Sequence, residues 1–588
     1  MMRNVLGSWL LVVGLVLSVG VTGCGDDDDG PPDSGSIDAG RDSGPAPADG
    51  GDAGPGPTDS GPPDAGPEPT DAGPPDAGPE PTDAGPPDAG PDLRPRAHVR
   101  FINAFVGVKN NPTDTADRPW DPFSVDLYVG AAKLFSAMKA GSASVSVFQE
   151  VILTGPTQSV RLVVRDAEGT AEAPEIAALA DVALADGDWV TIVGAGSLLQ
   201  VEPESVDKPK LVVLRDNALA TSTPGEVRVR FMSADRVLSD SAKRRFADEM
   251  GRPYGDNSVD AYTADSVEEG VPVPVDTTRV AILGTLPVFA PAQSGWLFYS
   301  LPEGTLKEGK ALYAINTGDD RRTLADDGAP ALLIVTAKED TSVRLQRGPL
   351  VYFFNGLLPA SVGGTTPSLQ VIYGSSNIAT DLRYGSTPRV GDVPVSATGV
   401  SLRVAVHNQP LQSVLEGATT GPLEAGRRYL GVLCGRVAAT PTITIVKDEF
   451  SAEDAQSPFL RFVHCSASSP TPLDFGSYTF HADGSSRETF TPLFTGAAFA
   501  TPAQPATGVA FSPPVSPTTP AYTWLGLKTV GATPIERTIR GRVLGTPTFL
   551  VLIGEWESSL TYRVLNTRVN GWGAASPNDP FFSPLPTP

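Results

Sequence analysis

The segment that decides the fold reads VRFINA at residues 99–104 and returns as VRFMSA at residues 229–234. Weaker copies read VYFFNG at residues 351–356 and LRFVHC at residues 460–465. Their starting points are 130, 122 and 109 residues apart, which is a usual size for a β-sandwich domain. A chain of 588 residues is also too long for a single hydrophobic core. We therefore expect four tandem domains, each beginning with this strand.

A second shared segment follows the opening strand in the first two repeats. Residues 118–128 read RPWDPFSVDLY and residues 252–262 read RPYGDNSVDAY, so six of eleven positions are identical without a gap. Repeats three and four keep only traces, SLQ at residues 368–370 and PLD at residues 472–474. The ungapped match predicts that the two SVD triplets occupy the same strand in both domains.

The rest of the body alternates short apolar runs with turn residues, a pattern typical of strands. One segment, residues 241–250, has an amphipathic helical pattern, and it lies within what we interpret as an insertion. We predict an all-β body of tandem sandwich domains after a disordered Pro/Gly/Asp-rich stalk. The predicted boundaries are 97–202, 226–348, 349–447 and 458–568, followed by a tail at 569–588.

Taken together, these motifs and a closing strand of the Gly-x-Tyr-x-Val-Val type resemble the domain-of-unknown-function family 4397. Its domains occur in tandem in secreted and lipid-anchored bacterial proteins. The resemblance rests on motifs in repeats one and two, and on strand pattern in repeats three and four. It implies an immunoglobulin-like or transthyretin-like sandwich and no activity, because none is assigned to the family. Insertions at residues 105–117 and 235–251 stand where the family has a short turn rich in Ser, Pro and Asp.

The N-terminus has the pattern of an export signal. Arg3 precedes an apolar run at residues 5–21, which is short for a membrane span and suited to a signal peptide. The sequence VTGC at residues 21–24 resembles a lipobox, which implies cleavage after residue 23 and lipidation of Cys24. The alternative is an ordinary secretory signal with an incidental cysteine. Gly25 after the cysteine favours the outer membrane by the enterobacterial sorting pattern, and it leaves open which face the body occupies.

Residues 24–96 form a spacer. Residues 25–96 hold sixteen Asp and two Glu against three Arg, a net charge of −15, and a 12-residue unit at 67–78 repeats at 79–90. Proline, glycine and mutually repelling carboxylates favour an extended, solvated tether. Of the net charge of −24, about −10 remains for residues 97–588 once the spacer and Arg3 are subtracted. A mildly acidic body argues against nucleic acid as a partner.

Sequence patterns for catalysis are scarce. The chain contains neither Gly-x-Ser-x-Gly nor His-Glu-x-x-His. Its four histidines, His98, His407, His464 and His481, are scattered over three repeats, so we predict no metal site and no cofactor. Cys434 and Cys465 remain after lipidation. They form either a disulfide across a domain junction or two buried thiols, and the sequence leaves this open.

The shared segment supplies the candidate binding residues: Arg118, Trp120, Asp126, Arg252, Tyr254 and Asp260. One hypothesis is a ligand surface of Arg, an aromatic ring and Asp, repeated in two domains. The other, which we favour, is that Asp accepts local backbone hydrogen bonds and Arg stacks on the ring, so that both maintain the fold.

We expect a non-enzymatic lipid-anchored envelope protein that binds glycan, matrix or another envelope protein, or acts as a spacer. One alternative is an envelope hydrolase with a site in the insertions. The other is a periplasmic assembly component. Any binding function is expected in the insertions, because loops on a rigid sheet scaffold vary without disturbing the core. Both insertions are therefore expected to be dispensable for folding.

Overall fold

The computed structural model describes residues 93–106, 123–141, 144–169, 173–198, 208–235, 243–256, 258–284, 297–319, 328–386, 388–450, 459–480, 487–511, 523–532, 537–541 and 547–565. All of them belong to one of the chain's two structural units, residues 89–588. The predicted signal peptide, Cys24, nearly all of the spacer and the tail lie outside the described residues.

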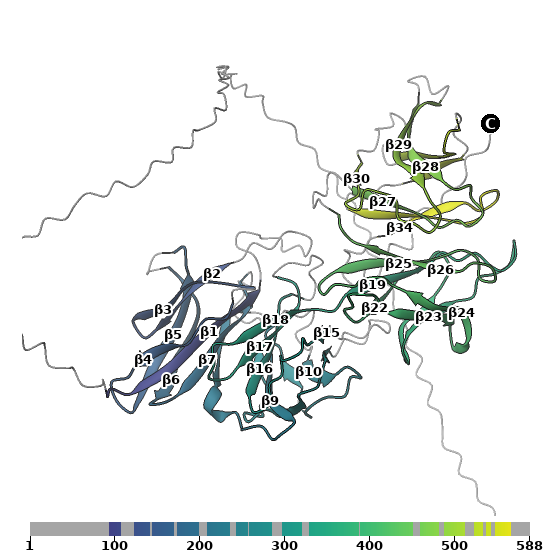
Figure 1. Cartoon of the computed structure of the whole chain (residues 1–588). Helices are drawn as coiled ribbons and strands as arrows, with labels where there is room; N and C mark the ends of the chain where they lie inside the picture. Colours follow the sequence, from purple (N-terminus) through teal and green to yellow (C-terminus); the bar gives the residue numbers. More distant parts are fainter. Residues whose placement is uncertain are drawn as a thin grey trace, which may run out of the picture. The chain divides into compact units, whose positions relative to one another are not determined.

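Strands make up four successive repeats (Figure 1). Repeat 1 contains β1 (Arg96–Val106), β2 (Ser124–Val129), β3 (Ala132–Lys139), β4 (Gln149–Ile152), β5 (Thr157–Asp166), β6 (Glu175–Ala185), β7 (Trp189–Ser197) and β8 (Lys210–Arg215). Repeat 2 contains β9 (Glu226–Ser233), β10 (Lys243–Asp248), β11 (Val259–Asp260), β12 (Thr263–Ala264), β13 (Val271–Pro274), β14 (Arg279–Gly284), β15 (Leu297–Ser300), β16 (Ala311–Thr317), β17 (Ala331–Thr336) and β18 (Ser342–Gln346). Repeat 3 contains β19 (Leu350–Asn355), β20 (Leu369–Tyr373), β21 (Ser376–Leu382), β22 (Arg389–Asp392), β23 (Ser401–Val406), β24 (Gln409–Thr419), β25 (Arg428–Cys434) and β26 (Thr442–Lys447). Repeat 4 contains β27 (Phe459–His464), β28 (Leu473–Phe480), β29 (Arg487–Ala497), β30 (Val509–Ala510), β31 (Thr523–Thr529), β32 (Arg537–Gly541), β33 (Thr548–Ile553) and β34 (Thr561–Leu565).

The predicted all-β class with tandem sandwiches is confirmed. Among the described residues the one helical element is a 3₁₀ turn, η1 (Asp216–Ala218). Two details of the prediction are wrong. The predicted helical segment at residues 241–250 contains the strand β10, and repeat 1 continues past residue 202 to β8, which pairs with β7.

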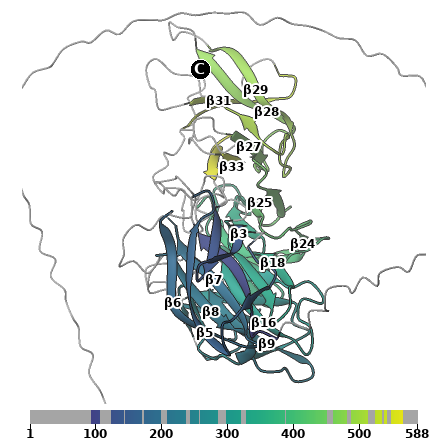
Figure 2. The same cartoon turned by 90° about the vertical axis from the view of Figure 1, so that its left-hand side faces the viewer.

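Each repeat is built from two sheets that share a topology (Figures 1 and 2). In repeat 1 the first sheet has the order β4-β1-β7-β8 and the second β3-β2-β5-β6. Repeats 3 and 4 repeat this order with their own strands, and repeat 2 adds β12 and β18 to its first sheet. In every repeat the opening strand pairs in parallel with the closing strand of the same sheet.

This central parallel pair explains why the opening strands were readable from sequence. In β1, residues 99–106 are all buried, because one face packs on the core of repeat 1 and the other on repeat 2. A strand buried on both faces reads as a nearly continuous apolar run. The predicted starts at Val99, Val229, Val351 and Leu460 all fall within the first four residues of an opening strand.

The repeats pack in pairs through the outer faces of their first sheets. One buried apolar cluster joins repeats 1 and 2, including Ile102 and Val193 from one and Ile315 and Val335 from the other. A second cluster joins repeats 3 and 4 in the same way, including Phe354 and Val551. These two junctions are separate from the four sandwich cores. The pairing was not predicted from the sequence.

The insertion predicted at residues 235–251 is a structural part of repeat 2. Asp235 is fully buried, and β10 is hydrogen-bonded to both β11 and β14. Phe246 on this strand belongs to the hydrophobic core. The expectation that this segment is a dispensable loop is therefore wrong. The other predicted insertion begins inside β1, at Phe105, and residues 107–117 lie outside the described residues.

Candidate functional site

In repeats 1 and 3, the Asn of the opening motif fastens the opening strand to the second sheet. Asn103 donates to the carbonyl oxygen of Met138 at 2.7 Å and accepts from the backbone N–H of Phe105 at 3.3 Å. Asn355 makes the same two contacts, donating to Leu382 at 2.9 Å and accepting at 3.1 Å from the second residue after it. Both asparagines are buried, so these bonds satisfy groups that water does not reach. The motif is explained by the fold.

Repeats 2 and 4 place other residues at this position. Ser233 donates to the buried carboxylate of Asp235 at 2.8 Å. In repeat 4 the position is His464, whose Nε2 lies 3.3 Å from the carbonyl oxygen of Pro470. Its Nδ1 has no hydrogen-bond partner among the described residues. The ring is fully buried, and this burial lowers the pKa of His464 to about 4.

Asp126, one of the candidate binding residues, is used inside its own sheet. It is 3% exposed, accepts from the backbone N–H of Ala137 at 2.8 Å, and lies 2.5 Å from the ammonium of Lys133. Ala137 has a left-handed φ of 50° at an irregularity in the β2–β3 pairing. Asp474 repeats this contact in repeat 4, accepting from the N–H of Gly496 at 3.0 Å. The carboxylate therefore pins a bulge.

Asp260 does not occupy the equivalent position in repeat 2. The counterpart of β2 is β10, since each is the second strand of its sheet. Asp260 instead lies on the edge strand β11, opposite Lys243 of β10, with its side chain 64% exposed. The ungapped match between residues 118–128 and 252–262 therefore gives the wrong strand equivalence. The weaker traces at Gln370 and Asp474 are in register with Asp126.

The other candidate residues of repeat 2 lie at the far end of β10. Arg252 is exposed, and its Nε lies 2.6 Å from the carboxylate of Asp248. Desolvation on its own raises the pKa of Asp248. Hydrogen bonds from the backbone N–H and side chain of Arg252 oppose it, and the pKa of Asp248 is lowered. Tyr254 packs on Phe246 with ring centroids 5.2 Å apart. Asp260 pairs with Lys243 at the start of β10. Lys243 lies five residues before Asp248, and five residues of strand span roughly 17 Å. Arg252 and Asp260 are therefore not brought together.

Two candidate residues, Arg118 and Trp120, lie outside the described residues. The proposed repeated surface of Arg, ring and Asp consequently has no described copy in which its three members meet.

A buried polar network at the junction of repeats 1 and 2 was not predicted. Arg100 of β1 lies 3.2 Å from Asp216 of η1, and both side chains are fully buried. Arg100 also donates to the carbonyl oxygen of Thr336 in repeat 2 at 2.9 Å. Asp216 accepts from Tyr313 of repeat 2 at 3.1 Å and from Thr191 of repeat 1 at 2.8 Å. Burial raises the pKa of Asp216, against the opposing effects of Arg100 and these bonds.

Three aromatic side chains lead from this network toward the surface. The guanidinium of Arg100 lies 4.3 Å from the ring centroid of Phe148, which meets Trp189 edge-on at 4.8 Å. Trp189 stacks on His98 with centroids 4.0 Å apart. All three rings are half-buried. His98 thus has a packing role beside the buried ion pair.

A second buried ion pair lies in repeat 2. Nε and Nη2 of Arg244 donate to the carboxylate of Asp235 at 2.9 and 2.7 Å, and both residues are at most 3% exposed. Nearby in the same repeat, Tyr299 donates to Asn316 at 2.8 Å. Burial raises the pKa of Tyr299 well above its usual range. Buried Arg–Asp pairs with these contacts hold the ends of strands together.

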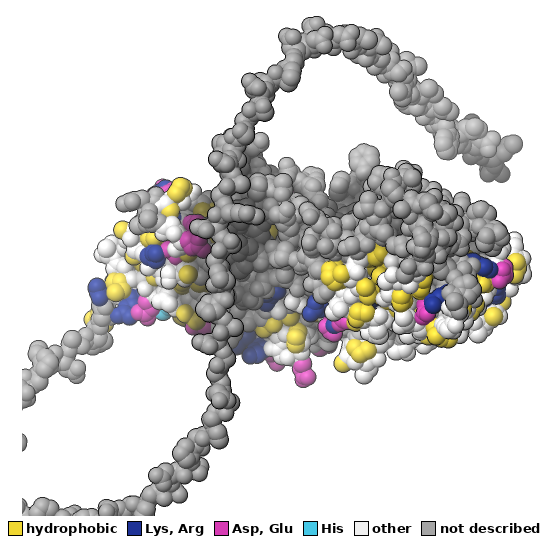
Figure 3. All heavy atoms as spheres, turned by 90° about the horizontal axis from the view of Figure 1, so that it is seen from above, with side chains coloured by type: hydrophobic (Ala, Val, Ile, Leu, Met, Phe, Trp, Pro, Cys, Tyr) yellow, Lys and Arg dark blue, Asp and Glu magenta, His cyan; other side chains and the backbone are white. Residues whose placement is uncertain are grey.

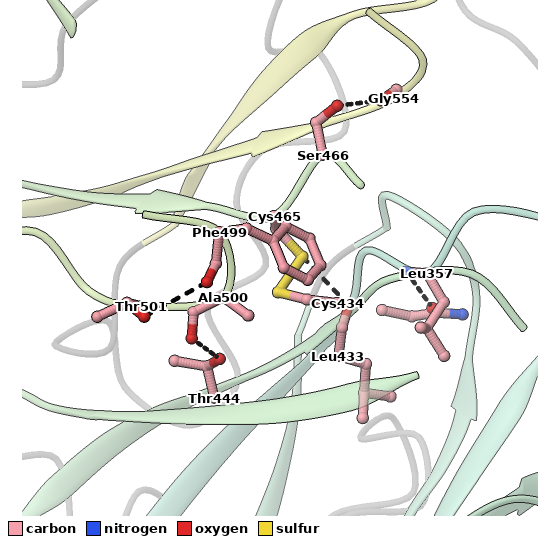
Figure 4. Close-up of a disulfide and its surroundings, with 11 residues drawn as sticks. Leu357, Leu433, Cys434, Thr444, Cys465, Ser466, Phe499, Ala500, Thr501 and Gly554 are labelled. Atoms are coloured by element: carbon pink, nitrogen blue, oxygen red, sulfur yellow. Dashed lines mark hydrogen bonds between the residues drawn. A yellow bond between two sulfur atoms is a disulfide. The ribbon is translucent and has the colours of Figure 1, made fainter. Parts of the chain in front are cut away.

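A disulfide between Cys434 and Cys465 crosses the junction of repeats 3 and 4 (Figure 4). Both cysteines are fully buried, and their Cα atoms are 5.0 Å apart. Close to it, Thr444 of repeat 3 donates to Ala500 of repeat 4 at 2.6 Å. Elsewhere in this junction an ion pair of 2.7 Å joins Arg436 to Glu555. Of the two alternatives left by the sequence, the structure has the disulfide.

The described residues contain neither a clustered set of metal ligands nor a membrane-spanning helix. Among the described residues there is no group of three His, Cys, Asp or Glu side chains placed to hold a metal ion. No helix within the described part of the chain is long and apolar enough to cross a membrane. On the face shown in Figure 3, apolar, basic and acidic side chains of the described residues are interspersed. Of the polar positions that repeats share, Asn103 bonds to the second sheet and Asp126 pins a bulge within one sheet.

Comparison with known proteins adds no family. No family model matches the chain, and no curated protein matches it. Among solved structures, the chain has similarity to the Bacillus anthracis TIE protein, with 6% sequence identity, covering 81% of this chain and 76% of that chain. The TM-score of 0.11 is too low to carry an argument about fold or function. The resemblance to family 4397 stays a prediction.

Proposed function

We propose that this chain is a lipid-anchored bacterial envelope protein. Its four sandwich domains act outside the cytoplasm by binding or scaffolding and not by catalysis. The partner classes that suit it are glycan, matrix or another envelope protein. Acylated Cys24 is the membrane anchor, residues 25–96 are the tether, and residues 97–565 are the presented body.

Two independent features support a membrane-anchored location outside the cytoplasm. The VTGC sequence ends an apolar run of signal-peptide length, and several acyl chains on one residue anchor a protein stably. The Cys434–Cys465 disulfide is the second feature, because structural disulfides persist in oxidising compartments outside the cytoplasm.

The observation that carries a presenting role is that junction contacts join the repeats in pairs. Buried apolar clusters, the Arg100–Asp216 pair and the disulfide hold adjacent repeats together. Inter-domain interfaces that are large and apolar oppose relative domain motion. Joined domains on a long tether suit display of a surface at a distance from the membrane.

The anchor is tested with Cys24→Ser in cells supplied with labelled palmitate. The wild type is expected to carry label in the membrane fraction, and the variant to carry none. A matched control is the double variant Cys434→Ala/Cys465→Ala, which keeps the lipobox and should stay labelled. Label on the Cys24→Ser chain would overturn the anchor.

The binding role is tested on residues 107–122, which contain Arg118 and Trp120 and connect β1 to β2. Replacement of this segment by a Gly/Ser linker of equal length is expected to preserve folding and to weaken attachment of cells to matrix or to neighbouring cells. Protease treatment of intact cells first establishes whether the body is exposed. A linker variant that folds and attaches like the wild type favours the spacer role over binding.

A further inference from the structure

The two repeat junctions are equivalent down to single positions. Val190 of β7 pairs with Val99, and Tyr429 of β25 pairs with Val351, so these two residues correspond. Five residues further on, Cys434 of repeat 3 therefore corresponds to Ala195 of repeat 1.

On the opening strands, Leu460 of repeat 4 corresponds to Val229 of repeat 2, so Cys465 corresponds to Ala234. Both alanines are fully buried, and both belong to the cluster that joins repeats 1 and 2. The first pair of repeats thus carries an alanine at each position where the second pair carries its disulfide.

With alanine at both positions, the junction of repeats 1 and 2 has no disulfide between its two domains. Repeats 3 and 4 are joined covalently and stay paired. Repeats 1 and 2 are held by apolar packing and by the hydrogen bonds that Arg100 and Tyr313 make across the junction, and such contacts can open and form again. Only residues 216–225 connect β8 to β9, a segment that spans roughly 30 Å when extended.

We propose that the junction between repeats 1 and 2 is an exchangeable interface whose partner is a second copy of this chain. In the exchanged dimer, repeat 1 of each molecule packs on repeat 2 of the other. Every contact of the junction is remade with chemically identical residues, so the two forms differ only in the connection and in the entropy of association. Exchange of an identical element is accordingly a low-cost route to dimers.

The disulfide limits the assembly. Two exchangeable junctions in one chain would allow open-ended linear assemblies, because each junction could exchange with a different partner. With repeats 3 and 4 locked, one junction per chain exchanges, and the reciprocal pair closes on itself.

The test uses the full-length chain purified from detergent extracts of whole cells, with the native cysteines in place. Ala195→Cys and Ala234→Cys are made separately, on chains with tags of different size, and also together in one chain. The single variants are mixed, incubated at 37 °C, oxidised, and separated without reductant. The expected result is a disulfide-linked dimer containing both tags, at least ten-fold above the yield from either variant alone.

Two controls make every outcome decisive. The double variant should form the disulfide within one chain, and, when oxidised before mixing, should give no mixed dimer. A mixture of Leu411→Cys, which is 97% exposed, with Ala234→Cys measures random collision. If the double variant oxidises and the mixed singles do not exceed random collision, exchange is overturned. If the double variant stays reduced, the equivalence of the junctions is wrong and the proposal falls with it. Loss of the lipid anchor would not alter these results, so failure of the proposed function is distinguishable.

Discussion

Arg100 and Asp216 form an ion pair of 3.2 Å in which neither side chain is exposed to solvent. The arginine comes from the opening strand of repeat 1 and the aspartate from the connection to repeat 2. Because burial removes both charges from water, each depends on the other for compensation.

Removing one partner is therefore expected to be costly. Asp216→Asn should lower the free energy of unfolding of the first repeat pair by about 3–5 kcal/mol, since it leaves Arg100 buried without a counter-charge. Urea unfolding measures the loss. The control is Glu175→Gln, which breaks the solvent-accessible pairs with Arg161 and Arg165 and should cost less than about 1 kcal/mol. Equal losses for the two variants would contradict the junction network.

Asp126→Ala and Asp260→Ala should differ, although the sequence motif treats the two residues alike. Loss of the Asp126 carboxylate leaves the N–H of Ala137 unsatisfied and is expected to cost about 1–3 kcal/mol. Asp260 is exposed, so its replacement should change stability by less than about 0.5 kcal/mol. Thermal melting of the two variants decides the matter. Similar destabilisation by both variants would contradict this assignment and indicate that Asp126 and Asp260 occupy equivalent strands.

His464 predicts an acid-sensitive repeat 4. The unfolded histidine binds a proton near pH 6.5, whereas burial lowers the pKa in the folded state to about 4. The contribution of the neutral His464 to stability is therefore fully present above pH 6.5. It is lost as the pH drops toward 4, by roughly 3 kcal/mol in total. His464→Asn installs the residue found at the equivalent positions 103 and 355 and should remove this component.

The measurement is urea unfolding of both chains at intervals between pH 7 and pH 4. His98→Asn, which changes a half-buried histidine in repeat 1, is the control and should keep the acid-dependent loss. A wild-type chain with the same stability at pH 4.5 and pH 7 would contradict a buried neutral imidazole.

The disulfide is expected to stabilise the second repeat pair by constraining the unfolded chain. Its cysteines are 31 residues apart, a separation for which loop-closure entropy gives about 3–4 kcal/mol. Cys434→Ala/Cys465→Ala recreates the alanine pair of the first junction and should lower the unfolding midpoint of repeats 3 and 4 only. A loss of less than about 1 kcal/mol would show that packing alone holds this junction.

The sequence predicts the opening strands well because their burial on two faces gives an unbroken apolar run. It misleads at β10, where the inward position Arg244 is charged and is neutralised by Asp235. A charged residue at a core position hides the strand periodicity, so residues 241–250 imitate an amphipathic helix. The pairing of repeats could not be predicted either. A strand face buried against a neighbouring repeat has the same apolar residues as a face buried inside its own domain, so the sequence does not distinguish the two.

The candidate site was predicted less well for a related reason. Asp126 and Asp260 share a motif, but only the hydrogen-bond register shows which strand each occupies. The signal that could have revealed the junction network is the arginine at the second position of the opening motif, which repeats as Arg100 and Arg230. An arginine within a buried strand requires a partner, and the sequence does not say that the partner of Arg100 is Asp216.

The left-handed residues on the edge strands have a consequence for crowding. Ala137 of β3, Asp181 of β6, Asp381 of β21, Gly417 of β24 and Gly496 of β29 have positive φ, and each strand pairs irregularly with its neighbour. A regular edge strand has a row of unpaired backbone N–H and C=O groups, which can pair with a strand of another molecule and start aggregation. Bulged edges interrupt that row. These five edges are therefore poor templates for cross-β growth when many copies of the protein are held close together.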